Sequence, residues 1–255
     1  MTSANPPQRP PDLLHLELEG GRRLAYRHRP GRGPTLLFLP GYMSDMDGSK
    51  ATALDAWAEA QGRAMLRFDY AGCGLSGGAF EAQGLADWRD DVIVMIDQVA
   101  EGPVVLVGSS MGGWLMLLAA LARPGRVKGL VGIAPAPDFT AWGFSDEQKR
   151  TIVAEGRLEE PSAYSNQPYV TTRTFWESGE TLRLLGSPID IQCPVRLLHG
   201  QADADVPWRV SVELAERLRS ADVQATLIKD GDHRLSREQD VALLIRTVDA
   251  LLEAL

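Results

Sequence analysis

A short apolar run followed by a glycine-rich turn constrains this chain more than any other stretch. Residues 104–107 read Val-Val-Leu-Val, and 108–112 read Gly-Ser-Ser-Met-Gly, a Gly-x-Ser-x-Gly pattern. The apolar segment 114–122 follows and is typical of a buried helix. A strand, a sharp turn and a helix in this order predict an elbow that lifts the Ser110 hydroxyl above a sheet edge. Side chains two positions before and after Ser110 would collide in such a turn, which explains glycine at both places.

The pattern on either side of this elbow alternates between apolar strand-like runs and amphipathic helix-like segments. Such alternation predicts a mostly parallel central sheet with helices on both faces, an α/β fold. Ligands of such sheets bind beyond the carboxyl ends of the strands. The predicted strands are 14–18 and 23–29 as a hairpin, 35–39, 64–68, 104–107, 127–134, 195–199 and 225–228, and the predicted helices are 49–61, 85–100, the segment after the elbow, 210–219 and 238–252.

The length of 255 residues and the 44% hydrophobic content suit a single core with one insertion. We expect a disordered tail over 1–12, a first part of the core over 13–134 and a second part over 191–255. Between them, 135–190 loses the alternation and is richer in prolines and polar residues. A long insertion at this side of a sheet predicts a lid over the site.

The aromatic residues of this insertion have two interpretations. They form an apolar wall for an acyl chain, or they are the lid's own small core. The candidate substrate-binding residues are Gly41, Trp142, Phe144 and Trp176. The aromatic residues considered are Trp142, Phe144, Tyr164, Tyr169, Phe175 and Trp176.

Charge and composition exclude several other classes of function. The net charge is −8 and no basic run occurs, so a nucleic-acid partner is not expected. No apolar stretch reaches 18 residues, which argues against an integral membrane protein. The two cysteines, Cys73 and Cys193, lack metal-ligand spacing and are expected to be free thiols in a reducing compartment. The proline-rich start has no secretory apolar region, so we expect a cytoplasmic protein.

A serine becomes a nucleophile at neutral pH when a base takes its proton and an acid orients that base. In sheets of this kind the order along the chain is nucleophile, acid, histidine. His233 follows the last predicted strand and is the candidate base, although a solvated loop histidine is the alternative. His199 is expected to have a structural role at the end of its own strand.

The acid is expected in the loop after strand 195–199. This loop contains Asp203 and Asp205, and we favour Asp203 because its place in Gly-x-x-Asp-x-x-Val-Pro fits a carboxylate held in the turn. Asp205 would then be solvated or would cap the next helix. Asp138, which follows an earlier strand, is a third and more distant candidate.

Developing negative charge on a reacting carbonyl needs two backbone N–H donors. Met111 follows Ser110 at the start of the helix and supplies the first. The turn Pro40-Gly41-Tyr42 after strand 35–39 supplies the second. Pro40 has no N–H and Gly41 permits a close approach, so we assign the second donor to Tyr42. The alternative is an ordinary turn that ends a strand.

A competing pattern, Gly-x-G-x-x-G over 72–77, also follows a strand. A dinucleotide fold needs a helix that opens at those glycines and an acidic residue that ends the next strand. Gly77, Gly78 and Gly84 interrupt any such helix, so we expect a tight loop beside the site and no cofactor. Cys73 in this loop is expected to pack rather than react. No metal cluster is visible in the sequence.

With these residues placed, the chain resembles the α/β-hydrolases. More narrowly, it is similar to the α/β-hydrolase-domain proteins described as mitochondrial palmitoyl-protein thioesterases and acyl-glucuronide esterases. The resemblance implies an α/β-hydrolase fold and assigns nucleophile, acid and base to Ser110, Asp203 and His233. The segments that carry it are 38–51 (Phe-Leu-Pro-Gly-Tyr-Met-Ser-Asp-Met-Asp-Gly-Ser-Lys-Ala), 67–72, 107–116, 196–200, 206–208 and 232–234.

Two departures from that family bear on the substrate. The lid, roughly 138–185, matches poorly, and the organelle-targeting start of the family is missing, which suggests a bacterial-type cytoplasmic relative. The expected reaction is cleavage of an ester or thioester of a small molecule or an acylated protein, through an acyl-enzyme on Ser110. A general small-molecule carboxylesterase is the alternative within enzymes, and a non-catalytic hydrolase-like binding protein is the alternative outside them. The oligomeric state is not predicted.

Overall fold

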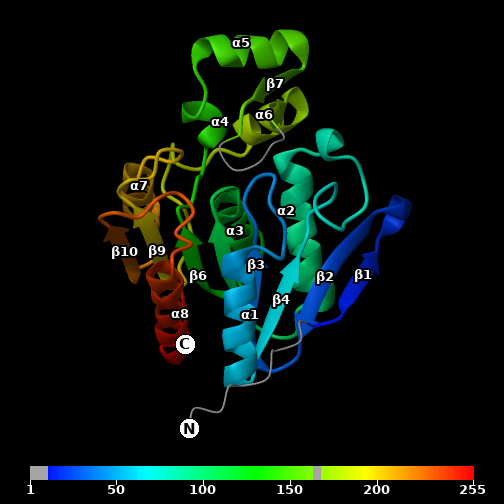
Figure 1. Cartoon of the computed structure of the whole chain (residues 1–255). Coiled ribbons are helices and arrows are strands. Elements are labelled where there is room, and N and C mark those ends of the chain that lie inside the picture. Colours follow the sequence, from blue (N-terminus) through cyan, green and yellow to red (C-terminus); the bar gives the residue numbers. More distant parts are fainter. Residues whose placement is uncertain (1–10, 163–167) are drawn as a thin grey trace.

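An eight-stranded sheet forms the centre of the computed structural model, which describes residues 11–162 and 168–255 (Figure 1). The strands are parallel except that β2 runs antiparallel to both of its neighbours. The predicted mostly parallel sheet is therefore confirmed. In spatial order the strands are β1 (Leu13–Glu17), β2 (Arg23–Arg29), β4 (Arg63–Phe68), β3 (Arg32–Leu39), β5 (Val104–Ser109), β6 (Val127–Ile133), β9 (Val195–Gly200) and β10 (Val223–Ile228).

Helices cover both faces of this sheet because the central strands are apolar on both sides. In β3, Leu36 and Phe38 belong to the core on one face, whereas Leu37 and Leu39 belong to the core on the other. This alternation is the period-two geometry of a strand. The first face is covered by α1 (Ser49–Gln61) and α8 (Glu238–Glu253), and the second by α2 (Leu85–Val94), α3 (Met111–Ala122) and α7 (Arg209–Arg217).

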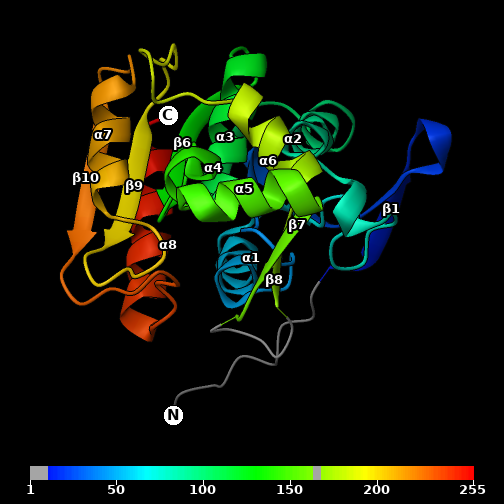
Figure 2. The ribbon, with the colours of Figure 1, turned by 90° about the horizontal axis from the view of Figure 1, so that it is seen from above.

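The chain between β6 and β9 leaves the sheet and builds a separate layer above it. Figures 1 and 2 show this layer over the carboxyl ends of the parallel strands, where the predicted lid 135–190 was expected. Tyr164 and the first ten residues of the predicted tail lie outside the described residues. The described elements of the layer are α4 (Phe139–Trp142), α5 (Asp146–Glu155), β7 (Arg157–Glu160), β8 (Tyr169–Thr172) and α6 (Arg173–Thr181).

The structure differs from the sequence predictions in part of the second predicted helix and in the inserted layer, whose helices and strands were not predicted. The predicted helix 85–100 is α-helical only to Val94 and then forms a π-helical turn over Met95–Val99, because the Ala100 N–H donates to the Met95 carbonyl five residues back. The short antiparallel pair of β7 and β8 was not predicted. Within the described ranges, no helix combines the length and the apolar character needed to cross a bilayer.

Candidate active site

Ser110 occupies the turn between β5 and α3 in a strained backbone conformation, with φ 54° and ψ −119°. A Cβ added to Gly108 would lie 2.3 Å from the Gly112 carbonyl oxygen, and one added to Gly112 would lie 2.1 Å from the Leu39 carbonyl oxygen. These contacts confirm that both positions need glycine. The turn is thus an elbow that holds Ser110 at the start of α3, next to the end of β3.

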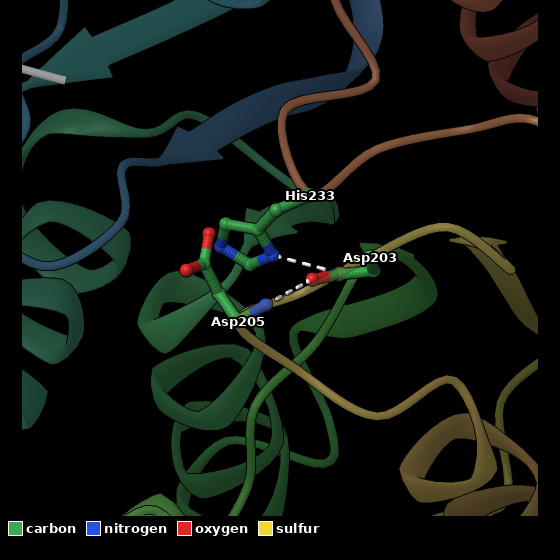
Figure 3. Close-up of side chains that lie close together, drawn as sticks. All are labelled: Asp203, Asp205 and His233. Atoms are coloured by element: carbon green, nitrogen blue, oxygen red, sulfur yellow. Dashed lines mark hydrogen bonds and ion pairs between the residues drawn. The ribbon is translucent and has the colours of Figure 1, made fainter. Parts of the chain in front are cut away.

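His233 and Asp203 meet Ser110 beyond the carboxyl ends of three different strands. The His233 Nε2 atom lies 3.1 Å from the Ser110 Oγ atom, and its Nδ1 atom lies 2.8 Å from the Asp203 Oδ2 atom. Asp203 follows β9, and His233 follows β10. The structure therefore brings the three predicted residues together in one hydrogen-bonded line. Figure 3 shows the His233–Asp203 part of this line.

The Asp203 carboxylate is fully enclosed and well supplied with donors. Its Oδ1 atom accepts from the backbone N–H groups of Asp205 and Val206 at 2.9 and 2.8 Å. Burial alone would raise the pKa of Asp203, but hydrogen bonds from His199 and His233 outweigh burial and hold that pKa well below its usual range. Asp203 is therefore ionised in the folded protein at neutral pH.

Asp205 lies on the other side of the imidazole, as Figure 3 shows, and is exposed to solvent. It does not cap α7, because the residue at the N-terminal cap of that helix is Trp208. Ligand atoms of Asp203, Asp205 and His233 all lie within 4.8 Å of one another, a spacing that a metal ion could use. A metal there would replace the His233–Asp203 hydrogen bond, so we interpret the cluster as part of the Ser110 site.

The two other sequence candidates in this region have structural roles. Asp138 is buried and accepts from the N–H groups of Leu184 and Leu185, which ties the layer above the sheet to the end of β6. Cys73 is buried as well, and burial raises the pKa of its thiol to about 12. The thiol is therefore protonated and unreactive at neutral pH, as predicted.

Gly41 and Tyr42, in the turn after β3, lie close to Ser110. A Cβ on Gly41 would lie 3.3 Å from the Ser110 Cβ atom, so glycine permits the predicted close approach. Asp69 fixes the loop that contains Tyr42, because its carboxylate accepts from the Met46 N–H at 2.7 Å. Met111 is the first residue of α3, where backbone N–H groups have no partner within the helix. The two predicted donors thus belong to the two segments that adjoin Ser110, the turn after β3 and the start of α3.

A cavity of about 720 Å³ opens beside Ser110 and His233. The predicted residues Gly41, Trp142 and Phe144 line it. Trp176, in contrast, is not among the described residues that line it, and its indole N–H donates to the Thr140 carbonyl within the layer itself. The substrate-binding assignment of Trp176 therefore needs correction. Further lining residues include Pro40, Tyr42, Met43, Lys50, Phe139, Tyr169, Asp205 and Arg234.

The aromatic residues of the inserted layer divide between the wall of the cavity and the packed core. Trp142, Phe144 and Tyr169 line the cavity, whereas Phe175 is only 1% exposed and packs in the core. The centre of this packing is Tyr42, whose ring lies 4.7 Å from Phe175 between ring centroids. Its other ring contacts are with Phe80, Trp88, Phe139 and Tyr169.

The Tyr42 hydroxyl donates to the Val170 carbonyl of β8 at 2.6 Å, which joins the turn beside Ser110 to the layer above it. We expect Tyr42→Phe to lower the free energy of unfolding by about 1 kcal/mol, because the half-buried Val170 carbonyl loses its donor. We also expect kcat/KM to fall several-fold, since the backbone of the same residue flanks the reacting carbonyl. Thermal unfolding and ester hydrolysis measure both effects. Tyr26→Phe on β2 is the matched control, and equal losses in the two variants would contradict this prediction.

His199, for which a structural role at the end of its strand was predicted, also contacts the Asp203 carboxylate. Its side chain is fully buried, and its Nε2 atom lies 3.2 Å from the Asp203 Oδ2 atom. The expected order of nucleophile, acid and histidine selects His233, which follows Asp203 in the chain. It gives no role to His199, which precedes Asp203. The spacing of His199 and Asp203, four residues apart across the turn after β9, was the signal available in the sequence.

Comparison with known proteins gives consistent matches. A family model described as serine aminopeptidase, S33, matches residues 34–152. The human protein named palmitoyl-protein thioesterase ABHD10, mitochondrial, is 44% identical over 236 residues, which cover 91% of this chain and 77% of that protein. Among solved structures, α/β hydrolase domain-containing protein 10 from mouse has a TM-score of 0.89 and 42% identity, over 95% of this chain and 99% of that chain. A putative hydrolase from Agrobacterium vitis S4 has the same TM-score and coverage with 37% identity.

Proposed function

Because the chain belongs to the α/β-hydrolase family of the palmitoyl-protein thioesterase ABHD10, we propose that it cleaves esters or thioesters through an acyl-enzyme on Ser110. The observation that carries this proposal is the line of hydrogen bonds from Ser110 through His233 to Asp203, with lengths of 3.1 and 2.8 Å. A serine hydroxyl beside a base that is itself oriented by a carboxylate is the arrangement needed for nucleophilic attack.

In the proposed reaction, His233 Nε2 takes the proton of the Ser110 hydroxyl while Oγ forms a bond to the substrate carbonyl carbon. The carbonyl oxygen becomes an oxyanion, which the N–H groups of Met111 and Tyr42 stabilise. The protonated His233 then gives its proton to the departing alcohol or thiol, and the acyl group remains on Ser110. A water molecule, deprotonated by His233 in turn, releases the acid and restores the serine. Asp203 stabilises the positive imidazolium in both halves.

We propose a long-chain acyl thioester as the substrate class. Supporting this, the relative is named a palmitoyl-protein thioesterase, and the cavity beside Ser110 has a volume within the usual range of about 300–1,000 Å³ for ligand sites. Trp142 and Phe144 contribute an aromatic wall on the side of the inserted segment. In this proposal 135–190 acts as a lid that selects the acyl group. A general small-molecule carboxylesterase remains the second candidate, because the cavity is also lined by polar and charged residues such as Lys50 and Arg234.

The test is release of thiol from a peptide thioester series with acyl chains from acetyl to palmitoyl. We expect kcat/KM to rise with chain length, because each buried methylene contributes about 0.8 kcal/mol. A flat series with good turnover of short esters would assign the protein as a general carboxylesterase. No release from any thioester or ester would reject the hydrolase proposal itself.

The variant Phe144→Ser tests the lid's part in this selectivity. We expect kcat/KM for the palmitoyl thioester to fall about tenfold, because a polar side chain replaces an apolar wall, while the acetyl thioester is affected little. Val153→Ser is the matched control: it makes a similar change on α5 of the same layer, at an exposed position. The same loss for both chain lengths in Phe144→Ser would mean that this residue does not contact the acyl chain.

A cytoplasmic location is also part of the proposal. It is supported by Cys73 and Cys193, which are both free thiols and fit a reducing compartment. The relative, by contrast, is named as a mitochondrial protein. Fractionation of the native cell, followed by detection of the protein in each fraction, decides between these locations.

A further inference from the structure

Two histidines share one oxygen of the Asp203 carboxylate. The Oδ2 atom lies 2.8 Å from Nδ1 of His233 and 3.2 Å from Nε2 of His199. The Oδ1 atom is already occupied by two backbone N–H groups of its own turn. The carboxylate that orients the candidate base therefore receives a second side-chain donor, which the reaction described above does not use.

The partners of His199 determine which of its nitrogens carries the proton. Nε2 lies 3.0 Å from the carbonyl oxygen of Val206, a group that only accepts, so Nε2 must be the protonated nitrogen. Nδ1 lies 2.7 Å from the Ser211 Oγ atom on α7. Both His199 and Ser211 are 0% exposed, so their polar atoms depend on partners within the protein. A neutral ring with Nε2–H directed at Asp203 and Val206, and with Nδ1 accepting from the Ser211 hydroxyl, satisfies every group.

We propose that His199, oriented by Ser211, is a positioning residue that acts through Asp203 and moderates how strongly this carboxylate holds a proton on His233. This inference rests on the proposed roles of Ser110, Asp203 and His233. A neutral donor at Oδ2 withdraws part of the negative charge that faces the imidazole of His233. The attraction between Asp203 and the imidazolium that forms on His233 during the reaction is thereby weaker.

The charged groups around His233 must be considered with this assignment. Asp205 faces the ring from the loop after β9, and Arg234 is the next residue in the chain. Lys50 reaches the Arg234 carbonyl from α1. All these groups are unchanged when His199 or Ser211 is replaced. A change in the pH dependence of the site in such variants therefore reports on the path from Ser211 to Asp203.

The experiment measures the rate at which a fluorophosphonate probe labels Ser110 at a series of pH values. Labelling requires His233 as a free base, and it can be measured without knowing the natural substrate. In His199→Met we expect the acid limb to move to higher pH by about half a unit or more, since Asp203 loses a donor. We expect the plateau rate to fall about tenfold as the carboxylate is held less firmly. His199→Gln keeps an N–H donor on a side chain of similar length and is expected to restore the acid limb.

Ser211→Ala provides a second variant in which His199 stays in place. Loss of the hydroxyl donor at Nδ1 weakens the opposite N–H as a donor, so the acid limb should move in the same direction by a smaller amount. His28→Met on β2 is the control for exchanging a histidine elsewhere. An acid limb that stays at the wild-type pH in Ser211→Ala, and in His199→Met where that variant folds, overturns the inference. Absence of labelling in the wild-type protein would reject the proposed function instead.

Discussion

Replacing Ser110 with alanine is expected to abolish turnover, with a loss of about a million-fold in kcat. The expectation follows from the geometry, because the Ser110 Oγ atom is the group that His233 Nε2 faces at 3.1 Å. Removing the nucleophile of such a set leaves only the contribution of binding and oxyanion donors. The variant should unfold at nearly the wild-type temperature, since alanine fits the space of the serine. Hydrolysis of a short ester and of a palmitoyl thioester measures the loss.

A fluorophosphonate probe makes the same test independent of the substrate. We expect one covalent addition on the wild-type protein, located at Ser110 by mass spectrometry, and none on Ser110→Ala. Ser187→Ala, a serine exchange at an exposed position of the chain, is the control and should behave as the wild type. A wild-type protein that gains no mass would indicate the alternative outside enzymes, a non-catalytic hydrolase-like binding protein. Residual wild-type turnover in purified Ser110→Ala would place the nucleophile elsewhere.

Asp203→Asn is expected to lower kcat by about ten thousand-fold. In the wild type, Oδ2 of Asp203 accepts from the Nδ1–H of His233 at 2.8 Å, so Nε2 is bare and can take the serine proton. An amide group in this place can donate to Nδ1, which moves the imidazole proton to Nε2. The ring then presents a hydrogen to Ser110 where it needs a lone pair, and proton transfer stops.

Asp205→Asn is the matched control, because the same exchange is made two residues later on the other side of the same imidazole (Figure 3). We expect less than about a threefold change, since Asp205 is exposed and water screens its charge. Steady-state kinetics at one pH, with thermal unfolding to establish that both variants are folded, compares the two. A loss in Asp205→Asn equal to that in Asp203→Asn would make Asp205 the orienting acid.

The core of the fold was predictable because its signals are local. The run 104–107 can be buried on both faces only in the middle of a sheet, and Gly108 and Gly112 fit only a tight turn. The same turn placed Ser110, and the order of elements along the chain then located Asp203 and His233. For Ser110 a pattern within a few positions determines the local geometry, whereas Asp203 and His233 were found from the order of the elements.

The parts that were not predicted depend on contacts between distant segments. The strand pair β7 and β8 is short and half polar, and it forms only in the context of the layer above the sheet. Trp176 follows Phe175 on α6, and a rotation of about 100° per residue directs the two rings to different surroundings. His199 lies near the end of β9. Its contact with Asp203 forms only because the loop after β9 turns back toward the strand.

The inserted layer leaves the core after β6 and returns at β9, and these two strands are paired neighbours, with Leu130 opposite Val195. Its two ends therefore join neighbouring strands, one at the carboxyl end of β6 and the other at the start of β9, so the segment can be lengthened, shortened or exchanged with little effect on the strands beneath it. The residues proposed for hydrolysis, Ser110, Asp203 and His233, all lie outside it. Evolution can therefore change the substrate specificity of such a protein by altering this segment, while the reaction chemistry is kept. Exchange of the same segment by protein engineering is expected to transfer a new substrate preference.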